Sequence, residues 1–436
     1  MDLKKEIKLS DLVPKRKPKE PKPETRAEPE KEKKPKKPKT SRLKKDLSFK
    51  RKPKAKREPV EEDEQPKKKR SKRAPRDRAK AKRAKKLVGL KIGGSQLAAA
   101  RIVNNGSPEL VQVAREKLDH GLVVGGELRE PELLSEQLRA FFRKNKLPRQ
   151  GVRLGIANNR IGVRIFEIAG IDDPKQLENA IRFRAQEVLP IPIEEAVLDY
   201  QVLGDRVDDE GNTIRRILLV VAYRELIDRY VLACKKAGIR LVGIDLEAFA
   251  LLRALAAPPE AGAAAADAAV VVVAIGHDRS TFAVSDGRVC EFTRVLDWGG
   301  GTLDVAIARE LDATPSEAEP FKRELSLAVD NVPEGLTEEQ AAAARDAVRR
   351  QLQSFARELV SSLQFYQNQP GSLGIGEIVI TGGTAHLTGL AEELQKLIGV
   401  RVRVGDPLTR VKLGRKLKDA EQVGSLAVAI GLGIED

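Results

Sequence analysis

Cysteine and long apolar runs are scarce in this 436-residue chain, and their scarcity excludes several classes of protein. The two cysteines, Cys234 and Cys290, are too few for a disulfide framework or a dedicated metal site. No stretch approaches the roughly 20 apolar residues that span a bilayer. The first ten residues, MDLKKEIKLS, lack the apolar core of a secretory signal. We therefore expect a reduced, cytosolic protein.

Histidine is also rare, and His120, His277 and His386 are scattered through the sequence. Their separations do not match the short spacings that are typical of metal ligands. Each histidine is therefore expected to be structural or exposed, and no catalytic constellation is evident around it.

Positive charge is concentrated in residues 1–86. That segment holds 37 Lys and Arg against 15 Asp and Glu, a net charge of +22, whereas residues 87–436 carry a net charge of −6. The segment also contains 11 of the 24 prolines and few apolar residues. Such a composition cannot bury enough apolar surface to offset the entropy lost on ordering. We therefore expect residues 1–86 to form a disordered basic tail.

The tail suits several negatively charged targets. Basic clusters such as residues 67–73 are compatible with nucleic acid, anionic lipid or an acidic partner protein. Phe49 is the only aromatic residue of the tail, which argues against base stacking on single strands. The alternative is a solubilising tether with a weak, salt-sensitive attraction to any polyanion.

The rest of the sequence is organised around a glycine turn within residues 87–102, LVGLKIGGSQLAAARI. Apolar runs on both sides of Gly93, Gly94 and Ser95 predict two strands joined by a tight turn. Glycine lets backbone N–H groups approach a phosphate because no Cβ holds the backbone away, and the serine hydroxyl adds a donor. These residues indicate a phosphate-binding turn, with a simple β-hairpin as the alternative.

Two further glycine turns also follow apolar strands. In residues 270–284, VVVVAIGHDRSTFAV, Gly276 opens a turn that aligns with the first. Bulkier residues follow it there, and the Asp278 carboxylate would repel a phosphate. In the third turn, Gly382 and Gly383 follow another predicted strand. Three such turns indicate phosphate binding more strongly than one turn alone.

Strands and helices alternate between these turns, which predicts an α/β fold. Residues 314–317 and 337–340 have the pattern of a capping box and predict two helix starts. The second helix carries a long apolar stripe at alternating three- and four-residue steps, which predicts a core-facing side. Predicted strands at residues 151–157 and 161–168 flank an Asn-Asn turn, so we expect these two strands to pair.

Three further motifs make the sequence similar to a known superfamily. They are IRFRAQEVLPIPIEEAVLDYQVL (181–203), SEAEPFKREL (316–325) and IVITGGTAHLTGL (378–390). Together with the glycine turns, they resemble the actin-like ATPase superfamily, which includes actin, the Hsp70 ATPase domain, sugar kinases and FtsA. The first of them most resembles the PilM family of type IV pilus assembly proteins. The resemblance covers roughly residues 87–433.

The resemblance implies an α/β fold of the two-lobed actin-like (ribonuclease H-like) ATPase type over residues 87–436. A small α/β subdomain is expected to be inserted at about residues 165–245. The second half is expected from about residue 269, after the low-complexity connector PPEAGAAAADA.

The resemblance also implies which residues contact ATP or ADP. In the superfamily, a Glu and a Lys three positions later lie on one helix face and contact the ribose and base. Glu319 and Lys322 match that spacing, and the alternative for them is a surface ion pair worth less than about 1 kcal/mol. The full set of implied contacts is Gly93, Gly94, Ser95, Gly276, Glu319, Lys322, Gly382 and Gly383.

Two departures from the superfamily's pattern argue against catalysis. An acidic residue normally lies two positions before the first glycine of each phosphate turn, where this sequence has Lys91 and Ala274. Mg²⁺ prefers oxygen ligands, which neither residue supplies. We therefore expect no metal site, no catalytic residue and no ATP turnover. Lys91 either neutralises a phosphate directly or fills the pocket and excludes nucleotide.

The resemblance implies a cytoplasmic scaffold of a type IV pilus assembly platform at the cytoplasmic face of the inner membrane. Its implied partner is the cytoplasmic segment of a PilN-like membrane protein, and nucleotide, where bound, acts structurally. Other platform proteins and a second copy of the chain are further partners that the resemblance allows. One alternative is an active Mg-ATP hydrolase or kinase of the same fold. A second is binding of anionic lipid, nucleic acid or another polyanion through residues 1–86.

Overall fold

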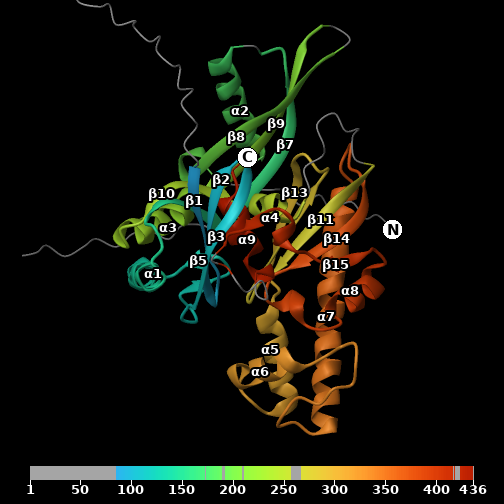
Figure 1. The fold of residues 1–436 in the computed structure, drawn as a ribbon. Coiled ribbons are helices and arrows are strands. Elements are labelled where there is room, and N and C mark those ends of the chain that lie inside the picture. The colour runs from blue at the N-terminus through green and yellow to red at the C-terminus, as the bar shows by residue number, and fades with distance from the viewer. Residues whose placement is uncertain are drawn as a thin grey trace, which may run out of the picture. The chain divides into compact units, whose positions relative to one another are not determined.

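The computed structural model describes residues 85–171, 173–188, 192–208, 211–256, 267–415, 417 and 423–435 (Figure 1). The chain divides into two units, Met1–Asp77 and Arg78–Asp436, and all described residues belong to the second. The tail expected over residues 1–86 lies almost wholly outside the described residues. Most of the connector between the two halves also lies outside them.

The first lobe is built on a six-stranded sheet with the strand order β10-β6-β1-β2-β3-β16. β1, β2 and β3 form an antiparallel meander, while β6 and β10 add parallel strands on the β1 side. The two strands predicted around the first glycine turn are therefore confirmed. The strands are β1 (Lys85–Ile92), β2 (Gln96–Asn105), β3 (Ser107–Lys117), β6 (Gln150–Ile156), β10 (Arg240–Leu246) and β16 (Lys412–Leu413).

Helices cover both faces of this sheet. Successive side chains of β1 point to opposite faces of the sheet. Leu90 points to one face, where it packs in a core shared with α1 and α3. On the other face, Gly89 lets α9 approach so closely that a Cβ at Gly89 would lie 2.0 Å from the Ala429 carbonyl oxygen. These helices are α1 (Pro131–Lys144), α3 (Arg224–Lys236) and α9 (Ala427–Gly433).

The second lobe contains a five-stranded sheet with the order β13-β12-β11-β14-β15. β11 and β12 are antiparallel around the second glycine turn, as predicted. β14 runs parallel to β11 and ends at the third glycine turn, so these two turns lie at the same edge of the sheet. The strands are β11 (Ala268–Ile275), β12 (Ser280–Ser285), β13 (Cys290–Leu296), β14 (Gly374–Thr381) and β15 (Val402–Val404).

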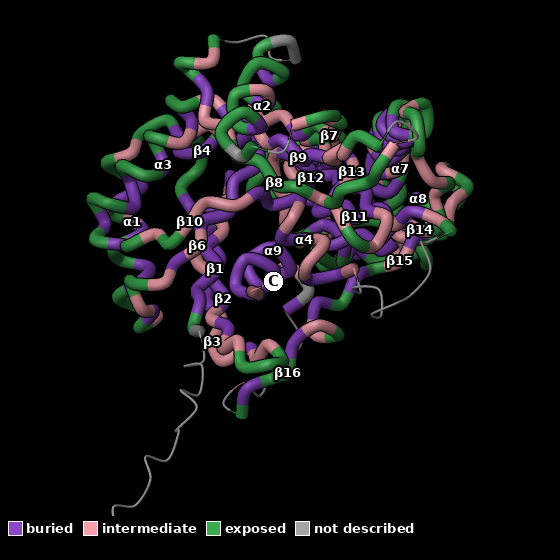
Figure 2. Tube along the Cα trace, turned by 90° about the horizontal axis from the view of Figure 1, so that it is seen from above, coloured by how far each residue is buried: buried purple, intermediate pink, exposed green. Residues whose placement is uncertain are grey.

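The helix α4 (Glu247–Leu255) crosses α9 between the two sheets. The crossing is close, because a Cβ at Gly431 would lie 1.8 Å from the Ala250 carbonyl oxygen. Figure 2 shows α9 as a buried element next to α4. The opposite face of the second sheet packs against α5 (Gly300–Leu311), α7 (Glu338–Gln367) and α8 (Leu390–Ile398).

Both predicted capping boxes start helices. Thr314 caps α6 (Pro315–Glu324) and Thr337 caps α7, and each threonine side chain accepts a hydrogen bond from the backbone N–H three residues later. The predicted stripe of α7 is buried in the core of the second lobe. Its residues are Ala344, Val348, Leu352, Phe355, Leu359, Leu363 and Tyr366. Within the described ranges, every helix is too short or too polar to span a membrane.

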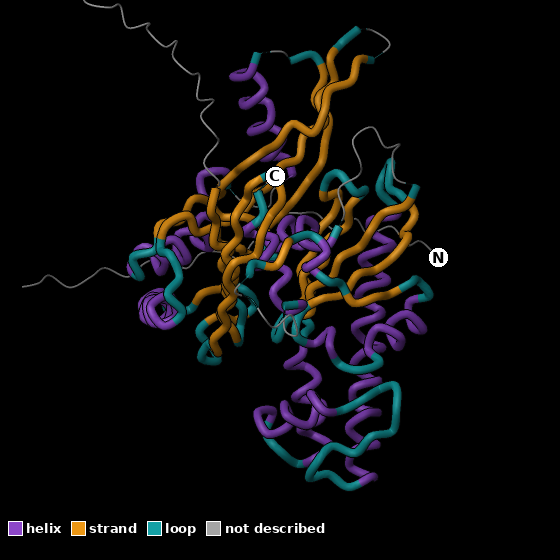
Figure 3. The backbone as a smooth tube through the Cα atoms, viewed as in Figure 1, coloured by secondary structure: helices purple, strands orange, loops and turns teal. Residues whose placement is uncertain are grey.

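A separate three-stranded sheet has the order β7-β9-β8, and Figure 3 shows its strands extending beyond the other two sheets. The helix α2 packs on one face of it through Leu177, Ile181 and Ala185. Its elements are β7 (Ile161–Ala169), α2 (Pro174–Val188), β8 (Ala196–Val207) and β9 (Thr213–Tyr223).

The expected pairing of the strands on either side of the Asn-Asn turn is wrong. β6 joins the six-stranded sheet and β7 joins the three-stranded sheet, so the turn is the point at which the chain leaves one sheet for the other. Asn158 explains the sharp exit, because its Oδ1 accepts a hydrogen bond from the Arg160 N–H at 2.7 Å. β10 lies at the end of the range of about 165–245 expected for the small subdomain, but it pairs with β6 in the first lobe.

Candidate functional site

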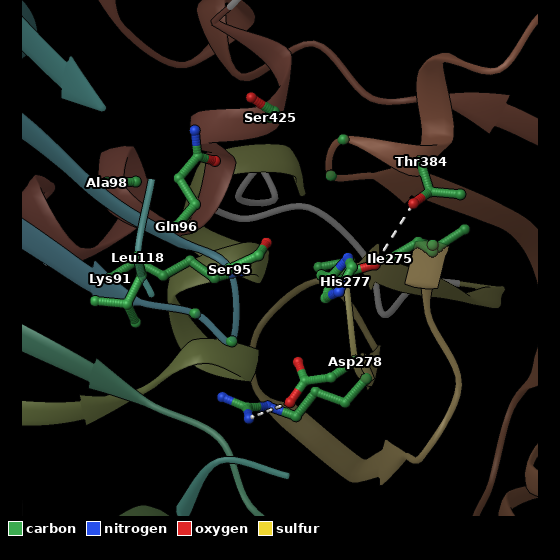
Figure 4. Close-up of a pocket in the computed structure, with 18 of the residues that line it drawn as sticks. Lys91, Ser95, Gln96, Ala98, Leu118, Ile275, His277, Asp278, Thr384 and Ser425 are labelled. Atoms are coloured by element: carbon green, nitrogen blue, oxygen red, sulfur yellow. Dashed lines mark hydrogen bonds and ion pairs between the residues drawn. The ribbon is translucent and has the colours of Figure 1, made fainter. Parts of the chain in front are cut away.

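A cavity of about 830 Å³ lies where the three glycine turns come together (Figure 4). Its lining includes six basic and four acidic side chains from both lobes, an excess that suits an anionic ligand. Every residue implied by the sequence for nucleotide contact lines it, namely Gly93, Gly94, Ser95, Gly276, Glu319, Lys322, Gly382 and Gly383.

The first turn, between β1 and β2, is closed by its own backbone. The Gly93 N–H donates to the Gln96 carbonyl oxygen at 2.9 Å. Gly94 has no room for a side chain, because a Cβ there would lie 2.8 Å from the carboxyl carbon of Asp278. Ser95 extends from this turn into the cavity (Figure 4). An aspartate from the second lobe therefore lies directly against the first turn.

The backbone of Gly276 in the second turn, between β11 and β12, is hydrogen-bonded within the protein through both its N–H and its carbonyl oxygen. The Gly276 N–H donates to the Arg279 carbonyl oxygen at 2.9 Å. The Gly276 carbonyl oxygen accepts from the Gly300 N–H at 2.8 Å and from the Thr384 hydroxyl at 3.4 Å (Figure 4). The first amide of α5 is thus bonded to the turn rather than available to a ligand.

The third turn requires glycine for two reasons. Gly382 has a φ of +96°, which side-chain-bearing residues rarely adopt. A Cβ there would also lie 2.2 Å from the Ile275 carbonyl oxygen, where the ends of β14 and β11 lie side by side. This close approach places Gly382 and Gly383 in the wall of the cavity.

The alternative for Glu319 and Lys322 was a surface ion pair with each other. Each of the two side chains instead has a different partner. The Lys322 Nζ lies 2.6 Å from Asp304 Oδ1 and donates to the Gly300 carbonyl oxygen at 3.1 Å, which ties α6 to α5. Glu319 pairs with Arg323 at 2.5 Å. Burial raises the pKa of Glu319, but the hydrogen bond and charge of Arg323, together with the charges of Lys322 and Lys117, outweigh burial and hold that pKa below its usual range.

Lys91 and Ala274 line the cavity at the positions where the superfamily has acids. The Lys91 Nζ lies 3.4 Å from Oε2 of Glu247, whose side chain is buried at the start of α4. No local pattern in the sequence marks Glu247, because only the parallel pairing of β1, β6 and β10 brings it beside Lys91. Among the described residues, no group of three or more His, Cys, Asp or Glu side chains is placed to hold a metal ion.

The histidines are not scattered in space as they are in the sequence. All three line the cavity, and the rings of His120 and His277 lie 5.6 Å apart. His277 Nδ1 lies 4.0 Å from Asp304 Oδ2. His120 and His277 come close because the loop after β3 and the turn after β11 converge on the cavity from different lobes.

Two α/β lobes, each with a glycine turn facing a shared cleft, define the actin-like ATPase class. Escherichia coli K12 cell division protein FtsA is 25% identical over 275 residues, which are 58% of this chain and 63% of FtsA. FtsA of Bacillus subtilis strain 168 is 22% identical over 322 residues, 66% of this chain and 71% of FtsA. The chain thus spans less than two thirds of the length of the Escherichia coli relative.

Within this class, the chain belongs to the family of the type IV pilus assembly protein PilM, whose profile matches residues 89–436. A solved PilM-PilN type IV pilus biogenesis complex contains a similar chain, with a TM-score of 0.66 and 25% sequence identity. The similarity covers 80% of this chain and 97% of that one.

Proposed function

We propose that the protein is a non-catalytic scaffold of a type IV pilus assembly platform at the cytoplasmic face of the inner membrane. The supporting observation is similarity over 97% of a chain from a PilM-PilN complex, together with the family match. Its partner is then the short cytoplasmic segment of a PilN-like membrane protein. ATP or ADP, where bound, acts structurally and is not hydrolysed, because Lys91 and Ala274 supply no ligand for Mg²⁺.

Purified protein is therefore expected to show no steady Mg²⁺-dependent ATP hydrolysis in a phosphate-release assay. The reason is that the two positions that hold the metal's water shell in the superfamily carry an ammonium and a methyl group. Turnover that is abolished both by EDTA and by Gly94→Arg, which obstructs the first turn, would contradict this expectation and favour the active ATPase.

The small subdomain is the surface we propose for the partner. β8 lies at the edge of its sheet, so an extended peptide can add main-chain hydrogen bonds there. Apolar side chains are exposed nearby, including Phe183 on α2, which is 64% exposed, and Val202 on β8. The proline-broken loop that the sequence also suggested, residues 189–192, lies mostly outside the described residues.

We expect titration of the N-terminal cytoplasmic peptide of the PilN-like protein into the full chain to give a micromolar dissociation constant. This corresponds to a binding free energy of about −8 kcal/mol. We expect Phe183→Ala to weaken binding by about tenfold, because a small interface depends on few apolar anchors. Phe365→Ala is the matched control, since Phe365 is also exposed but lies on α7 in the second lobe.

Equal binding by wild type and Phe183→Ala would place the interface elsewhere. Absence of binding to the wild-type chain would remove the scaffold proposal itself. Calorimetric titration of the same peptide into both proteins distinguishes these two outcomes.

A further inference from the structure

Asp278 follows the second glycine turn and reaches across the cavity to the first lobe (Figure 4). Its Oδ2 accepts a hydrogen bond from the Gly125 N–H at 3.0 Å. Gly125 lies in the turn between β4 (Val123–Val124) and β5 (Glu127–Leu128). The carboxyl group also covers Gly94, since a Cβ there would lie within 3.0 Å of all three of its atoms. One side chain of the second lobe therefore contacts two backbone turns of the first.

The surroundings of Asp278 hold the carboxylate in this position. The Arg279 Nη1 lies 3.5 Å from Asp278 Oδ2, and Arg279 is only 6% exposed. On the first-lobe side, Asn158 Nδ2 donates to the Gly125 carbonyl oxygen at 2.8 Å. The turn that donates to Asp278 is thus anchored to its own lobe, and a buried guanidinium balances the charge of the carboxylate.

The magnesium nucleotide that the fold implies does not fit these residues. A phosphate against Gly94 would occupy the space of the Asp278 carboxylate, and the two negative groups would repel each other. Lys91 pairs with Glu247 at 3.4 Å, on the side where a metal would need carboxylate oxygens. The first turn is already covered by an anion of the chain itself.

We infer that Asp278 is a built-in anion that takes the place of a nucleotide phosphate between the two lobes. Its carboxylate accepts a hydrogen bond from the Gly125 N–H, as a bound anion would, and lies against Gly94, so the lobes are joined without a ligand. The same carboxylate repels the phosphates of ATP and so weakens ATP binding. It leaves the part of the cavity beside Glu319 and Gly383 unchanged.

The test is calorimetric titration of ATP, in the presence of EDTA, into the full chain and into Asp278→Gly. Removing the carboxylate frees the backbone of the first turn, so we expect ATP to bind at least about tenfold more tightly to the variant. Adenosine, which carries no phosphate, should bind wild type and variant equally. Wild type that binds ATP as tightly as Asp278→Gly would overturn the inference, and so would an equal gain for adenosine.

Two further variants separate charge from shape. Asp278→Asn keeps the side chain's volume and its carbonyl acceptor, so it serves if the glycine variant does not fold, and it should tighten ATP binding through loss of charge alone. Asp297→Asn changes net charge equally on an exposed residue that does not line the cavity. It should leave ATP binding unchanged, and a gain equal to that of Asp278→Asn would overturn the inference.

Hydrogen exchange measures the contact between the lobes independently of any ligand. The Gly125 amide donates to Asp278, so its exchange should accelerate in Asp278→Gly and stay slow in wild type and Asp297→Asn. Equal exchange of this amide in wild type and Asp278→Gly would contradict the bridging role of the carboxylate.

Discussion

Phe355→Ala is expected to lower the free energy of unfolding by about 3–5 kcal/mol. Phe355 lies on α7, is fully buried, and stacks on Trp298 with ring centroids 4.0 Å apart and planes inclined by 12°. Truncation would leave a cavity in the core of the second lobe and remove the stacking contact. Equilibrium urea unfolding followed by circular dichroism measures the loss.

Phe365→Ala is the matched control for Phe355→Ala. Both residues lie on α7, but Phe365 is 56% exposed, so its truncation should cost less than about 1 kcal/mol. Similar losses for the two variants would mean that burial in the second-lobe core does not govern the stability of α7.

Lys91→Ala is expected to lower the free energy of unfolding by about 2–4 kcal/mol, because it leaves the Glu247 carboxylate buried without its charge partner. Glu247 is 2% exposed, and its Oε1 has no hydrogen-bond partner among the described residues. Lys91 itself is partly exposed to the cavity, which places the loss below that of a fully buried pair. Urea unfolding of the full chain again measures the difference.

The charge-reversed double variant, Lys91→Glu with Glu247→Lys, should recover at least half of the stability lost in Lys91→Glu alone. Lys396→Ala is the control, because Lys396 pairs with Glu393 at 3.6 Å on the surface, where a loss of less than about 1 kcal/mol is expected. Failure of the reversed pair to recover stability would show that the two charges do not interact.

The position of Glu247 beside residue 91 also affects any attempt to restore a metal site. Lys91→Asp with Ala274→Asp would supply the acidic residues of the superfamily, but the carboxylate introduced at position 91 would face Glu247. Two carboxylates that share one buried position repel each other, and one of them takes up a proton. We therefore do not expect this double variant alone to recover turnover.

The sequence by itself determined the features that depend on short stretches of chain. The glycine turns, the capping boxes at Thr314 and Thr337 and the buried stripe of α7 rest on local hydrogen bonds and on periodicity. The resemblance also named the residues that line the cavity, because its motifs have fixed internal spacing. Nothing local indicated that β6 and β7 belong to different sheets, since an Asn-Asn turn suits either a hairpin or an exit.

Only the tertiary structure decided how the charges of the cleft are paired. Lys91 meets Glu247 because β1 and β10 both pair with β6, and Asp278 covers Gly94 because the two lobes close on each other. Coulomb and contact energies depend on distance in space, and these partners are far apart along the chain. The sequence could therefore show that the superfamily's acids are missing, but not that the chain's own ion pairs and carboxylate occupy their surroundings.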